Sequence, residues 1–306
     1  MNRKHLIKHA TVIGAVLGIF MLGSVAAPRA ALAEEITLMH VHGLSYSADG
    51  KQLFVPSHHG LAVYSGGRWS KAPGPQHDYM GFSGSGSAFY SSGHPAPGAG
   101  LVNPFGVIKS VDGGKTWKKL GFEGESDFHL LAVSYTTNTV YVYNSAPNSR
   151  MSKAGLYYSM NDGVDWKHAE GHGLNDPPIS LAVHPSTPTI AAIGTKNGLY
   201  FSTDSGQSFR PLVSGREVVA VFFDLDGREL WYSSYAGKPQ LMRTGWSAAK
   251  STEMALPPLS RDAVAYIAQN PVERQEYAIA TFERSVFISK DGGRSWRQVA
   301  DKGRGS

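Results

Sequence analysis

Four eight-residue segments share one pattern, and their spacing constrains the fold more than any other feature of the chain. They read SVDGGKTW from Ser110, SMNDGVDW from Ser159, STDSGQSF from Ser202 and SKDGGRSW from Ser289. Their first residues are separated by 49, 43 and 87 positions, and 87 is close to twice 43. One copy has therefore lost the pattern between the third and the fourth.

Two weaker units complete the series. ELWYSSYAGKPQLMRTGW, at residues 229–246, keeps two flanking strands and a tryptophan, and GLAVYSGGRW, at residues 60–69, is shortened in the same way. Each of the six units reads as four short antiparallel strands, which is the period of a β-propeller blade. We predict an all-β, six-bladed β-propeller in a single domain at residues 34–303, with blades at approximately 39–75, 77–124, 125–173, 177–213, 215–256 and 259–303.

The shared turn has a physical rationale. An aspartate side chain can accept hydrogen bonds from backbone N–H groups of its own turn, and a nearby glycine can adopt positive φ. The closing aromatic residue is expected to pack between neighbouring sheets. The predicted acceptors are Asp112, Asp162, Asp204 and Asp291. The pattern resembles the Asp box, or BNR repeat, of the sialidase, sortilin and photosystem-assembly-factor propellers, where the box lies on the face away from known active sites.

Longer stretches resemble a family of exported bacterial Asp-box propellers that are labelled glycosyl hydrolases. The stretches are HVHGLSYSADGKQLFVPSHHGLAVY, HDYMGFS, FYSSGHPAPG and DFHLLAV. The Arg-Ile-Pro opening of sialidases is absent, and histidines stand where the sialidase arginines are expected, so sialidase activity is disfavoured. General glycoside hydrolysis needs two carboxylic groups about 5 to 9.5 Å apart. Asp78 and Asp127 are the best such pair, and the alternative is that each caps a loop or orients a neighbouring histidine.

Residues 1–33 read as a signal peptide. A basic start and an apolar run precede Ala31-Leu32-Ala33, which predicts cleavage after Ala33 and an extracytoplasmic location. A retained signal anchor is the alternative, and only that would bring the chain to a membrane. Removing residues 1–33 takes away Arg3, Lys4, Lys8 and Arg29, so that 29 Lys+Arg against 24 Asp+Glu becomes 25 against 24. This balance argues against nucleic acid as a partner.

Histidines gather on one predicted face. In antiparallel blades, the starts of inner strands and the links between second and third strands lie opposite the repeated turns. His40 and His42, on a predicted strand, would share one side because side chains alternate. Imidazole suits copper, zinc, iron or nickel, and a thioether from Met80 would favour copper. We predict a metal site formed by some of the following residues: His40, His42, His77, Met80, His94 and His129.

Three functions remain open at this point. The first is an exported metal-binding protein, with copper ahead of zinc and no organic cofactor, and there is no cysteine to supply a thiolate ligand. The second is a glycoside hydrolase in which Asp78 and Asp127 act on an extracellular glycan. The third is a platform for another exported protein, with docking on the links at residues 91–104 and 144–155. The sequence does not decide whether the chain is an enzyme.

Overall fold

The computed structural model describes residues 36–246 and 250–305, which form six antiparallel sheets and one two-stranded ribbon without a helix. The predicted signal peptide lies outside the described residues. The first three sheets contain β1 (Ser45–Tyr46), β2 (Leu53–Ser57), β3 (Gly60–Ser65) and β4 (Arg68–Lys71); β6 (Ser83–Gly84), β7 (Phe89–Ser91), β9 (Val107–Ser110) and β10 (Lys118–Gly121); and β11 (Leu131–Val133), β12 (Val140–Asn144), β13 (Gly155–Ser159) and β14 (Lys167–Ala169).

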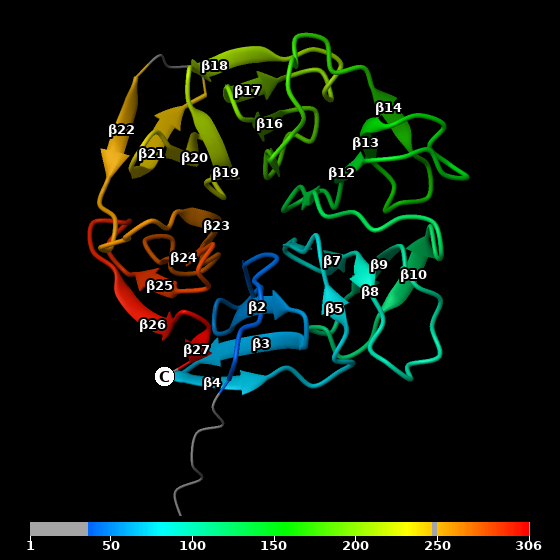
Figure 1. Ribbon diagram of the computed structural model, residues 1–306, viewed down its shortest axis with the longest axis horizontal. Helices are drawn as coiled ribbons and strands as arrows, with labels where there is room; N and C mark the ends of the chain where they lie inside the picture. The colour runs from blue at the N-terminus through cyan, green and yellow to red at the C-terminus, as the bar shows by residue number, and fades with distance from the viewer. Residues whose placement is uncertain (1–35, 247–249, 306) are drawn as a thin grey trace, which may run out of the picture. The chain divides into compact units, whose positions relative to one another are not determined.

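The last three sheets follow the same order along the chain. They contain β15 (Ser180–Val183), β16 (Ala191–Gly194), β17 (Gly198–Ser202) and β18 (Arg210–Ser214); β19 (Glu217–Phe223), β20 (Glu229–Tyr235), β21 (Pro239–Gly245) and β22 (Ser251–Met254); and β23 (Val264–Gln269), β24 (Tyr277–Thr281), β25 (Val286–Ser289), β26 (Arg297–Asp301) and β27 (Arg304–Gly305). The first strand of each sheet contacts the first strand of the next, and β23 contacts β1. The sheets thus surround a common centre (Figure 1), which confirms the six-bladed propeller.

A separate ribbon interrupts the second blade. β5 (Asp78–Tyr79) pairs with β8 (Gly93–His94) and stands outside the four-stranded sheet. The repeat predicted an inner strand beginning near residue 77, whereas the inner strand of this blade is β6. The ribbon lifts Asp78 and His94 out of the regular blade and makes them partners across two strands.

The hydrophobic core is divided among the six junctions between blades. One cluster, for example, joins Phe54 and Leu61 of the first blade to Phe89 and Ile108 of the second. The aromatic residues that close the repeated turns pack against these clusters, as predicted; Trp117 contacts the cluster just named. Burial of apolar surface between sheets is therefore the main stabilising contribution.

The two ends of the described chain close the ring together. Thr37 forms an antiparallel bridge with Arg304, and the Leu38 N–H donates to the Gly303 carbonyl at 2.6 Å. β27 in turn pairs with β26, so ordered structure continues to Gly305, beyond the predicted end at residue 303. Both Ile36 and Leu38 are buried, which anchors the segment that leads to His40.

The repeated turns have the expected hydrogen bonds. In the first copy, the Ser110 hydroxyl donates to Asp112 Oδ1 at 2.8 Å, and the Thr116 N–H donates to the same oxygen at 3.0 Å. The Gly114 N–H donates to Ser110 Oγ at 2.8 Å. The copies at residues 202–209 and 289–296 repeat this arrangement.

The second copy corrects one prediction. Here Asn161, and not Asp162, is the acceptor: it receives hydrogen bonds from the Ser159 hydroxyl and the Asp165 N–H. Asp162 occupies the next position with φ of 64°, where the first copy has a glycine. Its carboxylate instead accepts hydrogen bonds from the Tyr90 hydroxyl and from Lys109 Nζ in the preceding blade.

The antiparallel order places connections on two opposite faces. The repeated turns between third and fourth strands lie with the links between first and second strands, on what we call the turn face. The links between blades and those between second and third strands lie on the other face. We call it the histidine face, because His40, His42, His58 and His129 lie there.

Candidate metal site

The segment that carries His40 and His42 is irregular, although its sequence predicted a strand. β1 begins only at Ser45, and His40 has φ of 63°, in the left-handed region that non-glycine residues rarely adopt. The prediction of a strand failed because the chain turns here as it leaves the ring closure. The turn still brings the two imidazoles near each other, with ring centroids 6.2 Å apart and planes within 7° of parallel.

His58 lies against both of these rings. It belongs to the link between β2 and β3, and its backbone N–H donates to the Met39 carbonyl at 3.3 Å. Its ring centroid lies 4.6 Å from that of His40 and 5.1 Å from that of His42, with nearly perpendicular planes. The predicted strand order puts links between second and third strands on this face, but His58 was not among the predicted ligands.

Asp78 completes the group from the neighbouring blade. His58 Nδ1 and Asp78 Oδ2 are 2.8 Å apart. One nitrogen each of His42 and His58 and one carboxylate oxygen of Asp78 all lie within 4.8 Å of one another. We call these three residues the His42–His58–Asp78 triad. Two imidazoles and a carboxylate at this spacing can converge on one metal ion.

Partial burial keeps His42 neutral. The pKa of His42 is lowered to about 4, mainly because burial disfavours the imidazolium ion, and neighbouring imidazoles add to the lowering. The carboxylate of Asp78 acts on this pKa in the opposite direction. At neutral pH, His42 therefore offers a lone pair, which is the form that binds metals.

Two buried atoms of the triad have no hydrogen-bond partner in the described part of the chain. They are His42 Nε2 and Asp78 Oδ1. Buried polar atoms usually find a partner because leaving one unsatisfied costs about 1 to 3 kcal/mol. An unsatisfied nitrogen and an unsatisfied carboxylate oxygen in one cluster are complementary to a cation.

A second cluster lies beside the triad. His94 Nε2 is 3.0 Å from Asp127 Oδ2, and His129 Nδ1 is 3.4 Å from Asp127 Oδ1. His94 also contacts Asn103 Oδ1 through Nδ1, at 2.7 Å. Because His94 is the strand partner of Asp78, the two clusters adjoin across the β5–β8 ribbon. Each of the two carboxylates proposed for glycoside hydrolysis is thus paired with histidine.

The remaining two candidates serve the core of the second blade. His77 is 5% exposed, packs against Tyr79 and Phe105, and accepts a hydrogen bond from the Ala96 N–H at 3.0 Å through Nδ1. Burial lowers the pKa of His77. Met80 is buried too. Among the described residues, neither side chain has a hydrogen bond, ion pair or ring contact with the side chains of the triad.

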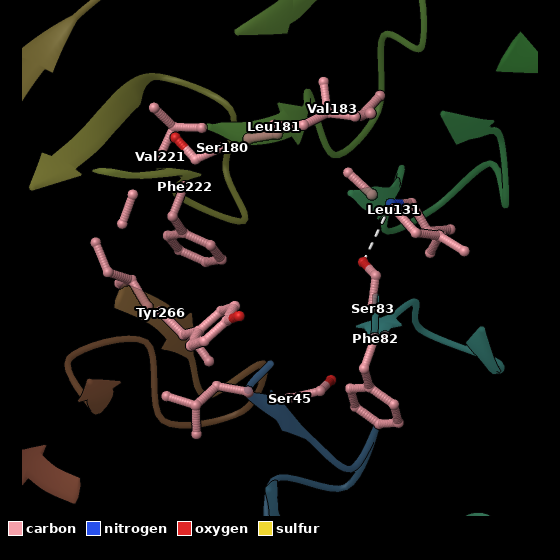
Figure 2. Close-up of a pocket in the computed structure, with 18 of the residues that line it drawn as sticks. Ser45, Phe82, Ser83, Leu131, Ser180, Leu181, Val183, Val221, Phe222 and Tyr266 are labelled. Atoms are coloured by element: carbon pink, nitrogen blue, oxygen red, sulfur yellow. Dashed lines mark hydrogen bonds between the residues drawn. The ribbon is translucent and has the colours of Figure 1, made fainter. Parts of the chain in front are cut away.

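A cavity of about 240 Å³ occupies the centre of the ring and reaches this site. His42 and His129 line one part of it, and residues from all six inner strands form its wall. Figure 2 shows Ser45, Ser83, Leu131, Val183 and Tyr266 around this central space.

No protein-family model matches the chain, and no curated protein sequence matches it. Solved structures do resemble it. A GH74 enzyme from Niastella koreensis superposes with a TM-score of 0.59 at 16% identity, over 86% of this chain and 46% of that one. The GH74 xyloglucanase from Xanthomonas campestris superposes with a TM-score of 0.54 at 15% identity, over 88% of this chain and 46% of that one.

A third structure, YCF48 bound to D1 peptide, has a TM-score of 0.51 and 16% identity, over 90% of this chain and 86% of that one. The chain spans about half the length of the two GH74 enzymes. At these identities the likeness shows a shared propeller fold. Within the part of the chain that the structure describes, no helix has the length and apolar character needed to cross a membrane.

Proposed function

We propose that this chain binds a divalent transition metal through His42, His58 and Asp78, with His40 as a further donor. The observation that carries the proposal is the convergence of three potential ligand atoms within 4.8 Å, where a buried imidazole nitrogen and a buried carboxylate oxygen lack other partners. The left-handed backbone of His40 supports it, because such conformations concentrate at functional sites. Binding, and not turnover, is the proposed activity.

The donor set favours copper(II) or zinc. Imidazole and carboxylate suit both ions, whereas the preference for copper depended on a thioether. The three proposed donors include no thioether, so neither ion is proposed ahead of the other. His94 and His129 are omitted from the proposed ligands because neither belongs to the group whose ligand atoms lie within 4.8 Å of one another. They remain available to orient a molecule bound beside the metal.

Metal content tests the proposal directly. The mature protein, produced without a polyhistidine tag, is incubated with zinc or copper, desalted and analysed by elemental mass spectrometry. We expect about one ion per chain for the wild type and almost none for the double variant His42→Ala, His58→Ala. The matched control is His172→Ala, because His172 is exposed on another link.

Circular dichroism must show that both variants stay folded. His42 Nε2 has no hydrogen-bond partner to lose, whereas the loss of His58 removes its ion pair with Asp78. The melting temperature of the double variant should therefore fall, but its spectrum at room temperature should match that of the wild type. Equal metal content in the double variant and the wild type would refute the assignment of the site.

We also propose that the protein acts outside the cytoplasm. The basic and apolar pattern of residues 1–33 supports this. N-terminal sequencing of the protein recovered from cells should begin at Glu34. A protein that keeps Met1 and remains in the cytoplasmic fraction would contradict export.

Glycoside hydrolysis is the second candidate. It is favoured by the fold shared with GH74 enzymes and by the presence of Asp78 and Asp127 on one face. It predicts release of reducing ends from plant or cell-wall oligosaccharides. The variant Asp127→Asn separates the two functions, because it should abolish hydrolysis while leaving the metal bound. A broad glycan screen without turnover would remove this candidate.

An interaction platform is the third. The link at residues 95–104 exposes Leu101 and Val102, which are 38% and 54% accessible. Its two ends are held by His77 and His94 through Ala96 and Asn103, so the link is a defined surface. Deleting residues 96–102 should abolish capture of an exported partner and leave metal content unchanged.

A further inference from the structure

The first strands of the six blades supply polar groups to the central cavity. They are β1, β6, β11, β15, β19 and β23. Each pairs with a neighbour on one side only, so its other edge faces the centre of the ring (Figure 1). Along such an edge, alternate backbone N–H and C=O groups have no partner strand. These edges therefore offer the cavity hydrogen-bond donors and acceptors that are fixed in place and carry no charge.

Two aromatic side chains extend into the cavity from neighbouring blades. Figure 2 shows the rings of Phe222, from β19, and Tyr266, from β23, in the central space. The pairing of β19 with β20 shifts between Val218 and Ala220, and that of β23 with β24 shifts immediately before Tyr266. The other four inner strands of the described chain keep their register. Because a bulge changes the direction of the side chains around it, these two irregularities account for the inward rings.

Hydroxyl groups add to the strand edges. Ser83 Oγ accepts from the Val133 N–H at 3.1 Å, which leaves the proton of the Ser83 hydroxyl available. Within residues 36–246 and 250–305, the Tyr266 hydroxyl has no hydrogen-bond partner, and Figure 2 shows it pointing into the central space. Burial raises the pKa of Tyr266 to about 12, so this hydroxyl stays protonated at neutral pH and can donate. A ligand that itself carries hydroxyl groups can accept from and donate to such a wall.

Charge is scarce in the cavity wall. Among the described residues that line the cavity, none is a lysine, an arginine, an aspartate or a glutamate. The two histidines, His42 and His129, lie at the end nearest the histidine face, and the lowered pKa of His42 keeps it neutral at neutral pH. A charged ligand would give up its hydration here without an opposite charge to replace it. A neutral ligand is therefore favoured.

We propose that the central cavity binds one neutral, hydroxylated six-membered ring of the pyranose class. Its hydroxyl groups exchange hydrogen bonds with the strand edges, Ser83 and Tyr266, and its C–H faces pack against the rings of Phe222 and Tyr266. Cavities of roughly 150 Å³ take up benzene in other proteins. A cavity of about 240 Å³ thus has room for a ring that carries hydroxyl groups. The inference does not depend on a bound metal.

The test uses the mature protein and four methyl pyranosides as probes: the β-glucoside, the β-galactoside, the β-xyloside and the α-mannoside. Saturation-transfer NMR titrations measure their affinities. We expect at least one to bind with a Kd of about 10 mM or below. Cyclohexanol has the ring with a single hydroxyl, and methyl β-glucuronide adds a carboxylate. Each should bind at least about 10-fold more weakly than the best pyranoside, because the first cannot satisfy the strand edges and the second brings an unpaired charge.

The variant Tyr266→Phe tests the position of the ligand. It keeps the ring and removes a hydroxyl that has no partner in the described structure, so the fold should be unchanged, as circular dichroism would show. Loss of one hydrogen bond to the ligand should weaken the best pyranoside about 3- to 10-fold. Tyr235→Phe is the matched control, because Tyr235 is 36% exposed and lies outside the cavity wall, and it should bind as the wild type does.

Three results would overturn the proposal. They are no saturation transfer to any of the four pyranosides, equal affinity for cyclohexanol and the best pyranoside, and equal affinity of the folded Tyr266→Phe protein and the wild type. Metal content is measured on the same preparation before any probe is added. Because pyranoside binding is expected with or without metal, failure of the metal site is recognised separately from failure of the cavity site.

Discussion

The turn face and the histidine face of this propeller use the same residue types in opposite ways. On the turn face, Asp112 finds its partners within its own turn: Ser110 and Thr116 donate to its carboxylate. On the histidine face, Asp78 and His42 belong to different blades, and each keeps a buried polar atom without a hydrogen bond in the described structure.

The difference separates stabilising from functional polar groups. Hydrogen bonds that are complete within eight residues hold a turn and leave nothing to offer a ligand. A cluster assembled from distant segments, with unsatisfied atoms and a left-handed His40, costs stability unless something binds to it. The two faces should therefore respond differently to substitution.

Among the substitutions considered, removing a buried carboxylate from the turn face should cause the largest loss of unfolding free energy. Asp224, 3% exposed, follows β19 in the blade that lacks the repeated turn. It accepts hydrogen bonds from Trp231 Nε1 at 2.7 Å, Tyr277 at 2.9 Å and Arg243 at 3.1 Å. The variant Asp224→Ala should lose about 3 to 5 kcal/mol of unfolding free energy, since it leaves these donors unpaired, as urea denaturation would measure.

The matched substitution on the histidine face is Asp127→Ala. Its partners His94 and His129 are 39% and 61% exposed at the side chain and can turn to water. We expect Asp127→Ala to lose less than about 1 kcal/mol of unfolding free energy. Equal losses for Asp224→Ala and Asp127→Ala would break the distinction between the faces.

Protonation of His42 should make the unfolding free energy of the metal-free protein depend on pH. The pKa of His42 is lowered from 6.5 to about 4, so between these values the unfolded chain binds a proton that the folded chain does not. The unfolding free energy of the metal-free protein should fall as the pH decreases from 6.5 to 4, by about 1 to 2 kcal/mol, because partial exposure screens the effect. Chemical denaturation at several pH values measures this slope.

The variant His42→Gln provides the control, since it cannot gain the proton in either state. Its stability should change less than that of the wild type over the same pH range. A carbon NMR titration of metal-free protein should place the midpoint of His42 near 4, and an ordinary midpoint near 6.5 would contradict the burial argument.

Substitution of the acceptor in a repeated turn should lower the unfolding free energy by a moderate amount. The pKa of Asp112 is lowered to about 2 because its carboxylate accepts hydrogen bonds from Thr116 and Ser110. Its contribution to stability is present above the unfolded pKa of 3.8 and disappears as the pH falls toward 2. At neutral pH, Asp112→Ala should cost about 1 kcal/mol and leave metal content unchanged, as denaturation and elemental analysis would show. A cost that persists undiminished at pH 2 would contradict this explanation.

How far the sequence predicts the molecule also differs between the faces. The spacing of Ser110, Ser159, Ser202 and Ser289 predicts the number of blades, because each turn depends on residues within one short segment. The triad depends on separate connections that meet only when the ring closes. Strand alternation could not place His40, since its φ of 63° breaks the period, and it gave no reason to choose His58 over its neighbour.

The second blade shows the same limit. Asp78 was predicted at the start of an inner strand. It lies instead in the ribbon of β5 and β8, opposite His94. His77 turns into the core, where the Ala96 N–H supplies its partner. Met80 is buried in the same blade. A ribbon that leaves the repeat has no periodic signal, so the directions of its side chains were not predictable from spacing.

The smallest expected change in unfolding free energy tests whether Asn161, and not Asp162, is the acceptor that holds the second repeated turn. Asn161 accepts hydrogen bonds from Ser159 and Asp165, so Asn161→Ala should cost about 1 kcal/mol of unfolding free energy. Asp162→Gly removes the partner of Lys109 and Tyr90 but relieves a left-handed residue, and these contributions of opposite sign should nearly cancel, leaving a change within about 0.5 kcal/mol. Denaturation of both variants compares them directly. If Asp162→Gly proved the more costly change, the ion pair with the preceding blade would be a stronger support than the turn itself, and this turn would depend on distant segments as Asp224 does.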